Sequence, residues 1–282
     1  MRYATAIKVG PRNFRVGCDW RAPIAALDRL YAAYPRDCGI AHATVRLEAT
    51  RWHRRLVRPQ LSIRGDHLLP DALPVGLQHG LLAAEMGMNL QMALGERHFL
   101  LIHAASVERD GRAVLLAGDS GSGKSTLAAA LSFGGWRFLG DEFALIDPVG
   151  GLLHPFPRPV SLKNDAIDVM QSRLPPDRFG PLIAGTPKGD IRHLVPDAAS
   201  IARMEEPARP ALILFPCFGG AAAIGAVGAG EAFVRLTQAS TNYTALGEAG
   251  FAALTRLVTA VPAAAIAYPD TATAIAQLES LW

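Results

Sequence analysis

The chain has 282 residues, of which 50% are hydrophobic and 19% are charged, and its formal net charge is +3. This composition predicts a globular protein with a sizeable core and excludes an intrinsically disordered chain. The longest apolar runs, such as 211–215, end at Pro or Gly well before the roughly 20 residues that a membrane span needs, so we expect no spanning helix. Residues 1–8 lack the apolar segment of a secretory signal, so we expect a cytoplasmic location.

Two features of composition bear on partners. The three cysteines, Cys18, Cys38 and Cys217, lack C-x-x-C spacing, which argues against a disulfide framework or a zinc site and predicts buried free thiols. The basic surplus is N-terminal, and its densest part comprises Arg51, Arg54, Arg55 and Arg58. Because no recognised nucleic-acid module surrounds this cluster, we interpret it as a solvated strand or turn and expect no nucleic-acid partner.

Residues 1–95 form the first predicted domain, a small α+β module. Apolar residues at helical spacing predict a helix over 23–34, and alternating residues predict a half-buried strand over 44–48. Residues 61–64 could pair with that strand, and the segment 77–94, rich in Leu, Met and Ala, predicts a second helix.

Residues 96–282 form the second predicted domain, in which glycines separate short apolar runs as in an α/β fold. We expect strands at 99–102, 113–117, 137–139, 143–146 and 211–215, with helices at 123–131 and 244–261. The strands on either side of residues 140–142 are expected to continue one sheet. Two stretches with Pro and Gly, 155–159 and 175–189, predict long surface loops, and 219–230 predicts a loop around a short strand.

A glycine-rich segment between a predicted strand and a predicted helix matches G-x-x-x-x-G-K-[ST] in full. Its glycines let the backbone turn tightly and point N–H groups at phosphate oxygens. Lysine in this motif reaches the β- and γ-phosphates, and the following hydroxyl binds Mg²⁺. The sequence therefore predicts a site for ATP and Mg²⁺ made by Gly118, Asp119, Ser120, Gly121, Ser122, Gly123, Lys124, Ser125 and Thr126, with Ser125 as a metal ligand.

Two groups of carboxylates follow this segment. Asp147 precedes Pro148, and we interpret it as the opening residue of a turn. Asp141 and Glu142 form an acidic pair inside an apolar run, where two carboxylates would destabilise the fold unless a metal or cation neutralised them. We therefore expect Asp141 to be functional, either in binding Mg²⁺ or in deprotonating a hydroxyl.

His103, the glycine-rich segment and Asp141-Glu142 together resemble the core of HPr kinase/phosphorylase. The resemblance is closer to the HprK-related kinase A family, and it implies a P-loop kinase core of the HPr kinase / PEP carboxykinase type. It implies that Asp141 is the general base, that His103 positions or polarises groups beside it, and that Glu142 is a metal ligand. Glu142 stands where the HPr kinases have a second Asp.

The chain uses Arg for nearly all of its positive charge, so each lysine outside the glycine-rich segment stands out. The resemblance extends over most of the chain, and its segments 155–163 and 188–194 contain four basic residues. These are candidate acceptor or phosphate contacts, with surface charge as the alternative: Lys163, Lys188, Arg158 and Arg192.

The predicted function is an ATP-dependent kinase that transfers the γ-phosphate to a serine hydroxyl of a protein or peptide acceptor. In this reaction Lys124 stabilises charge on the transferred group. A kinase acting on a small molecule and a non-catalytic ATP-binding regulatory protein are the alternatives. The resemblance also makes a homo-oligomer a candidate assembly, and we expect no membrane partner.

Overall fold

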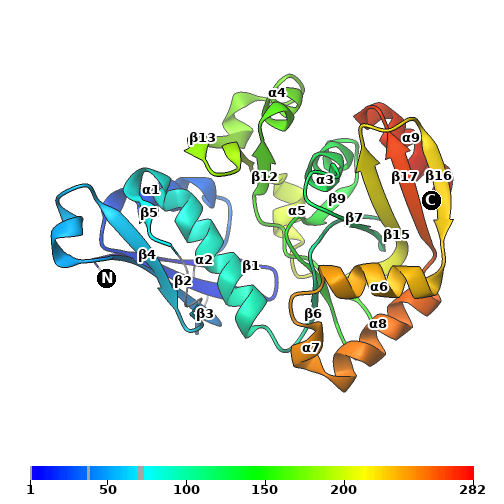
Figure 1. Ribbon diagram of the computed structural model, residues 1–282, viewed down its shortest axis with the longest axis horizontal. Coiled ribbons are helices and arrows are strands. Elements are labelled where there is room, and N and C mark those ends of the chain that lie inside the picture. The colour runs from blue at the N-terminus through cyan, green and yellow to red at the C-terminus, as the bar shows by residue number, and fades with distance from the viewer. Residues whose placement is uncertain (1, 37–38, 69–72) are drawn as a thin grey trace.

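The computed structural model describes residues 2–36, 39–68 and 73–282, a mixed α/β protein whose strands form several sheets (Figure 1). No helix within these ranges is long and apolar enough to span a bilayer.

The N-terminal part is a five-stranded sheet covered by two helices. Its strands lie in the order β1 (Tyr3–Val9), β2 (Arg12–Cys18), β3 (Ala43–Ala49), β4 (Gln60–Gly65) and β5 (Val75–Gly76). The helix α1 (Arg21–Leu30) contacts β1 and β2, and α2 (Gly80–Gly95) contacts β3 and β4. The predicted pairing of 61–64 with 44–48 is confirmed, because β3 and β4 are antiparallel with Leu47 opposite Ile63. The basic cluster lies at the short helix η1 (Trp52–Arg55), a partly exposed turn between β3 and β4.

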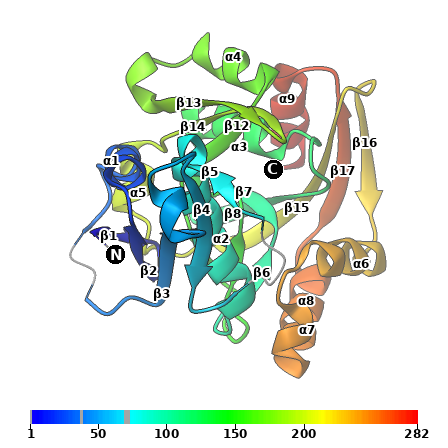
Figure 2. The same ribbon diagram turned by 60° about the vertical axis from the view of Figure 1, so that its left-hand side comes forward.

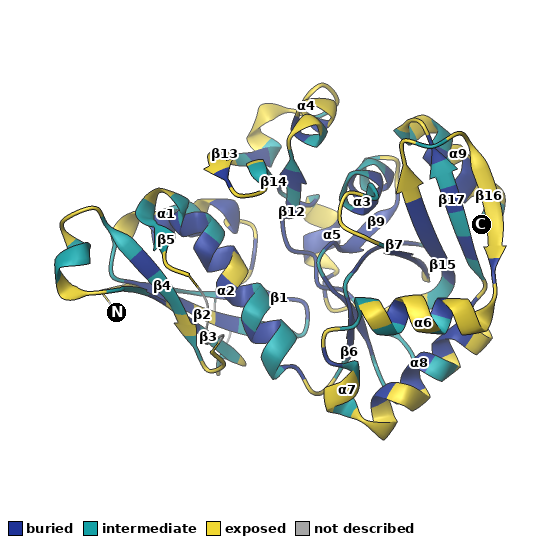
Figure 3. Ribbon diagram, in the orientation of Figure 1, coloured by how far each residue is buried: buried dark blue, intermediate teal, exposed yellow. Residues whose placement is uncertain are grey.

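The largest sheet has six strands and two covered faces. Its order is β16 (Ala223–Val227), β17 (Ala263–Tyr268), β15 (Arg209–Phe218), β8 (Arg112–Ala117), β7 (Ala104–Arg109) and β9 (Arg137–Gly140). The helices α3 (Lys124–Phe133) and α9 (Thr271–Leu281) cover one face, and α6 (Ala229–Ala239) and α8 (Glu248–Ala260) cover the other (Figure 1). Figure 3 shows the buried centre of β15 and the exposed edge strand β16.

The strand β8 shows why this sheet is recognisable in the sequence. Its side chains alternate between two cores: Val114 and Leu116 pack beneath α3, whereas Leu115 packs beneath α6 and α8. Because helices cover both faces of the sheet, the strand is a continuous apolar run, although only one of its two neighbours, β15, is parallel to it and the other, β7, is antiparallel. The predicted strands at 113–117 and 211–215 and the predicted helix at 123–131 are confirmed.

Two smaller sheets complete the structure. One has the order β11 (Leu153–His154), β10 (Ala144–Ile146) and β6 (Leu100–Ile102), and the other has the order β12 (Val160–Lys163), β14 (Gly189–Leu194) and β13 (Phe179–Thr186). The second of these, with α4 (Asp165–Gln171), lies above α3 in Figure 2. Between it and β15 the chain forms the short helix α5 (Ala198–Ala202).

Both predicted surface loops are wrong. Residues 155–159 are buried throughout, because the Tyr34 hydroxyl donates to the Pro157 carbonyl at 2.5 Å and Arg158 inserts beneath α2. The second stretch, 175–189, contains β13, which pairs with β14 through a turn whose Gly189 has φ +84°. Proline and glycine in these stretches mark buried backbone and a hairpin instead of long loops.

Three other expectations also change. The strands β9 and β10, on either side of residues 140–142, belong to different sheets, because β10 pairs with β6 and β11. The late helix divides at Gly247, whose φ of +57° ends α7 (Tyr243–Leu246) before α8 begins. Cys18 is buried as expected, but Cys217 is exposed at the end of β15, and Cys38 lies outside the described residues.

Candidate functional site

The glycine-rich loop, residues 118–123, connects β8 to α3. Gly118, Gly121 and Gly123 have φ values of +148°, +88° and +92°, which side chains other than glycine rarely adopt. The ammonium of Lys124 is buried within the loop and donates to the carbonyls of Gly118 at 2.7 Å and Asp119 at 2.8 Å. The loop is thus wrapped around a cation at the N-terminus of α3, which carries the positive end of the helix dipole.

The loop also contains an unsatisfied polar atom. Ser122 Oγ is buried and has no hydrogen-bond partner within the described ranges. A buried hydroxyl without a partner is costly unless a ligand or water completes it. Asp119, Ser120 and Gly121 at the tip are exposed, so a ligand can approach from solvent. Half-buried Ser125 and Thr126 begin the helix directly behind Lys124.

Tyr268, at the end of β17, supports the loop from the side. Its hydroxyl donates to the Ser122 carbonyl at 3.1 Å, and a Cβ atom on Gly123 would collide with this hydroxyl. Burial raises the pKa of Tyr268 to about 12, so the phenol remains a donor at neutral pH. Sequence reasoning missed Tyr268, because 145 residues separate it from Gly123 and only the parallel pairing of β17 with β15 brings it here.

Asp141 lies beside the loop, immediately after β9, and is 5% exposed. Burial first, and then the charge of Glu142, raise its pKa to about 7, while the nearby Ser125 hydroxyl, Lys124 and Lys163 act in the opposite direction. Burial in turn lowers the pKa of Lys124, against the charges of Asp141, Glu142 and Asp119. The structure therefore brings Lys124, Ser125, Asp141 and Lys163 into one electrostatic cluster.

Asp141 also presents a free acceptor. Its Oδ1 atom is buried without a hydrogen-bond partner in the part of the chain that the structure describes. By contrast, Asp147 accepts from the backbone N–H groups of Val149 at 2.9 Å and Gly150 at 3.0 Å, which confirms its prediction as a turn residue.

His103 and Glu142 are neighbours at the rim of this cluster. His103 Nδ1 lies 2.9 Å from the Glu142 carbonyl oxygen and 3.8 Å from Glu142 Oε2. The backbone N–H of His103 donates to the Ala239 carbonyl at 2.8 Å, which fixes the residue between β6 and β7. Both side chains are partly exposed, so they can meet a ligand.

The four basic candidates have different placements. Lys163 ends β12 opposite Ile191 and is close enough to Asp141 and Lys124 to affect the pKa of each. Lys188 is exposed in the turn between β13 and β14. Arg192 is half-buried, with its Nε atom donating to the Gly180 carbonyl at 2.9 Å.

Arg158 is buried away from solvent, and its placement argues against an open phosphate contact. It is 2% exposed, with its NH2 atom 2.5 Å from Glu85 Oε2 and its Nε donating to the Tyr31 hydroxyl at 3.1 Å. It also donates to Asn89, and His193 Nε2 lies 4.0 Å from the same Glu85 oxygen. Arg158 therefore belongs to a buried network that joins Tyr31, at the end of α1, and the helix α2 to the chain before β12.

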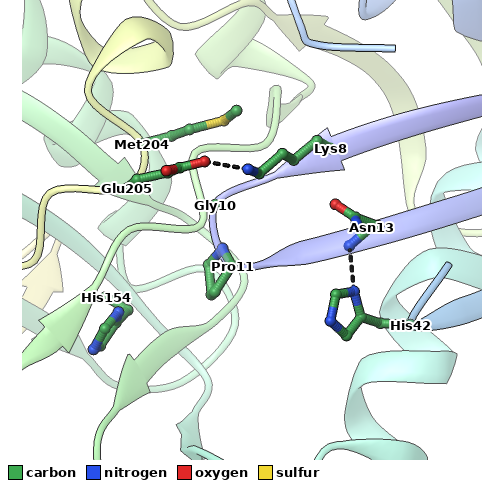
Figure 4. Close-up of a pocket in the computed structure, with 8 residues that line it drawn as sticks. All are labelled: Lys8, Gly10, Pro11, Asn13, His42, His154, Met204 and Glu205. Carbon is green, nitrogen blue, oxygen red and sulfur yellow. Dashed lines mark hydrogen bonds and ion pairs between the residues drawn. The ribbon is translucent and has the colours of Figure 1, made fainter. Parts of the chain in front are cut away.

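A separate hollow of about 300 Å³ lies beside the turn between β1 and β2 (Figure 4). Lys8 forms an ion pair with Glu205 across it, and His42 Nδ1 accepts from the Asn13 backbone N–H at 3.1 Å. The residues that line this hollow are not among those predicted for the site.

The donor set around residues 118–125 fits a phosphorylated ligand. Glycines in left-handed conformations, a buried lysine and a helix N-terminus are the groups with which proteins bind phosphate. The partnerless Ser122 Oγ and Asp141 Oδ1 fit polar atoms of a ligand, and the hydroxyl and carboxylates of Ser125, Asp141 and Glu142 are oxygen ligands of the kind that Mg²⁺ prefers. The fold and this site define a mixed α/β protein with a candidate phosphate site.

Comparisons with known proteins add one family and one structure. The family described as SynChlorMet cassette protein ScmC matches residues 82–169, which are less than half of the 282 residues. It is a different family from the HPr kinases that the sequence motifs resemble. The matched segment includes the glycine-rich loop, Asp141 and Lys163. Among solved structures, the Hpr(Ser) kinase/phosphatase from Coxiella burnetii is 13% identical with a TM-score of 0.27, covering 64% of this chain and 90% of that one. This likeness is too small to assign a fold. No curated protein matches the sequence.

Proposed function

We propose that the protein is an ATP-dependent kinase that transfers the γ-phosphoryl group of ATP to a serine hydroxyl of a protein or peptide. The observation that carries this proposal is the placement of Asp141, a buried carboxylate with a partnerless oxygen beside Lys124 and Ser125. A buried carboxylate repels phosphate unless it meets a proton or a cation, so its presence here supports a role in taking up a proton or in holding Mg²⁺.

The chain's own residues divide the work of holding the donor. Loop N–H groups and Lys124 would bind the phosphates, and Ser125 with Glu142 would hold Mg²⁺. Bound Mg²⁺ neutralises phosphate charge in reactions of this class. His103, in contact with Glu142, positions that residue, and Lys163 offers a further cation to the transferred group.

Asp141 has the chemical role of general base. The acceptor oxygen bonds to the γ-phosphorus while the bond from this phosphorus to the oxygen bridging the β-phosphate breaks. The proton of the acceptor hydroxyl moves to Asp141, and ADP leaves. Burial makes this carboxylate more basic than an exposed one.

The substitution Asp141→Asn tests the proposal. It keeps the shape of the side chain but removes the base, so we expect phosphate transfer to fall by about 10²- to 10⁴-fold while ATP binding stays within about threefold. Transfer is measured as label from [γ-³²P]ATP that appears in protein or peptide bands of a cell extract, and binding is measured by calorimetry.

Asp147→Asn is the matched control, because the Asp147 carboxylate accepts from backbone N–H groups of its own turn. This variant should transfer label as the wild type does. Equal transfer by Asp141→Asn would overturn the general base. Label in a small molecule would favour a small-molecule kinase, and ATP binding without transfer would favour a regulatory protein.

A further inference from the structure

We propose that Phe218 is the platform on which the base of the bound nucleotide stacks. This inference rests on the proposed function, because it requires that the glycine-rich loop bind a nucleoside triphosphate.

The sheet places Phe218 next to the loop. The strands β8, β15 and β17 are parallel, with Leu116 opposite Leu214 and Phe218 opposite Tyr268. Their carboxyl ends therefore lie along one edge, the position at which open α/β sheets bind ligands. β8 ends at the loop, β15 ends at Phe218 and β17 ends at Tyr268.

Phe218 contacts two residues of the site, Gly123 and Tyr268. A Cβ atom on Gly123 would lie 3.4 Å from Phe218 Cβ, so the residue adjoins the base of the loop where α3 begins. Its ring centroid lies 5.9 Å from that of Tyr268, at an interplanar angle of 56°. Tyr268 thus holds one side of Phe218, while its own hydroxyl is engaged by the Ser122 carbonyl.

The rest of the Phe218 ring faces solvent. The residue is 58% exposed, so more than half of this aromatic residue is open to a ligand. An exposed ring that is held in place beside a phosphate site offers a flat surface to a nucleobase. Every nucleobase has a π-face, so an aromatic ring can stack on any of them.

The sheet order also gives the direction of the nucleotide. β7 and β9 lie on one side of β8, with Asp141 after β9, and β15 and β17 lie on the other side. A nucleotide whose γ-phosphate faces Asp141 and whose phosphates occupy the loop extends its base away from Asp141, over the end of β15. Phe218 is the exposed aromatic residue of that strand end.

The experiment compares ATP with inorganic tripolyphosphate, which carries the phosphates without the base. We expect Phe218→Ala to weaken ATP binding by about 5- to 100-fold, as expected for the loss of one stacked base, and to leave tripolyphosphate binding within about twofold. Phe218→Trp should retain ATP affinity, whereas Phe218→Leu, which keeps apolar bulk without a π-face, should lose most of it.

Phe251→Ala is the matched control, because Phe251 is 54% exposed and lies on α8, which covers the face of the large sheet opposite to α3. It should bind both ligands as the wild type does. Wild-type affinity for ATP in Phe218→Ala, or an equal loss of affinity for ATP and tripolyphosphate, would overturn the stacking role and leave the proposed function standing. If the wild type binds neither ligand, the proposed function falls, and the stacking role with it.

Discussion

The buried histidine His193 shows how a single side chain makes stability depend on pH. It lies on β14 and is 1% exposed, and burial lowers its pKa. The neighbouring charges partly cancel, because Glu85 and Glu142 raise the pKa while Arg158 lowers it. His193 is therefore neutral in the folded protein at neutral pH, whereas the unfolded chain takes up a proton near pH 6.5.

This difference predicts loss of stability on acidification. Below about pH 6.5 the unfolded state binds more protons than the folded state, so the free energy of unfolding falls as the pH falls toward the lower folded pKa. Urea unfolding of the ligand-free protein at pH 7.5 and pH 5.5 measures the effect. His193→Gln should reduce the difference between the two pH values, and His42→Gln, at a mostly exposed position, should reduce it less. An unchanged difference in His193→Gln would contradict the prediction.

At the level of elements, the turn from β8 into α3 was the easiest part of the fold to predict. A strand buried on both faces, a run of glycines and an apolar helix follow one another, so each local pattern agrees with the next. The hairpin β1–β2 was missed because its apolar alternation is short: β1 begins with exposed residues, and the charged Arg12 occupies a buried position of β2. The strands β13 and β14 were missed because proline and glycine near their ends resemble loop residues, although their pairing satisfies the backbone.

The contact between Gly123 and Tyr268 gives a prediction for this turn. Gly121 and Gly123 both have positive φ, but a Cβ atom on Gly121 would meet open space and one on Gly123 would meet the Tyr268 hydroxyl. Gly121→Ala should therefore cost about 1 kcal/mol through backbone strain, and Gly123→Ala about 2–3 kcal/mol through strain and collision. Thermal unfolding of the ligand-free variants measures both.

A double substitution separates strain from collision. Gly123→Ala with Tyr268→Phe should regain part of the lost stability, because the colliding hydroxyl is gone. Equal losses of stability in Gly121→Ala and Gly123→Ala would contradict a contribution from the collision with the Tyr268 hydroxyl.

At the scale of the whole molecule, one core crosses the boundary between the two predicted domains. The apolar cluster around the N-terminal sheet includes Leu101, Phe143, Leu145 and Phe156. The Arg158–Glu85 pair lies in the same region. The division at residue 95/96, a homo-oligomeric assembly and a cytoplasmic location all stay predictions.

The buried ion pair predicts that the two parts unfold together. Arg158→Met leaves Glu85 buried without its main partner, which should cost about 3–5 kcal/mol, whereas Glu85→Leu combined with Arg158→Met should recover at least half of that loss. Urea unfolding should show one transition for all three proteins. A loss below about 1 kcal/mol in Arg158→Met, or two transitions in the wild type, would contradict this coupling.

The candidate site was only partly predictable, and the reason is distance along the chain. The loop, Asp141 and His103 lie within about 40 residues and have recognisable spacing. Tyr268 and Phe218 lie about 100 or more residues beyond the loop, and nothing in their local sequence distinguishes them from other aromatic residues. Only the parallel register of β8, β15 and β17 makes them neighbours. The burial of Arg158 was not predictable for the same reason, because its partners are Tyr31, which follows α1, and Glu85 on α2.

The exposed thiol at the end of β15 has a practical consequence. Cys217 precedes Phe218 and lies near enough to Tyr268 to affect the pKa of that phenol, whereas Cys18 is buried and its own thiol pKa is raised by burial. A thiolate reacts and a thiol does not, so a maleimide dye would label Cys217 in preference to Cys18. In a Cys38→Ser background, such a dye would report, through a change in fluorescence, each arrival and departure of a ligand at this edge of the sheet.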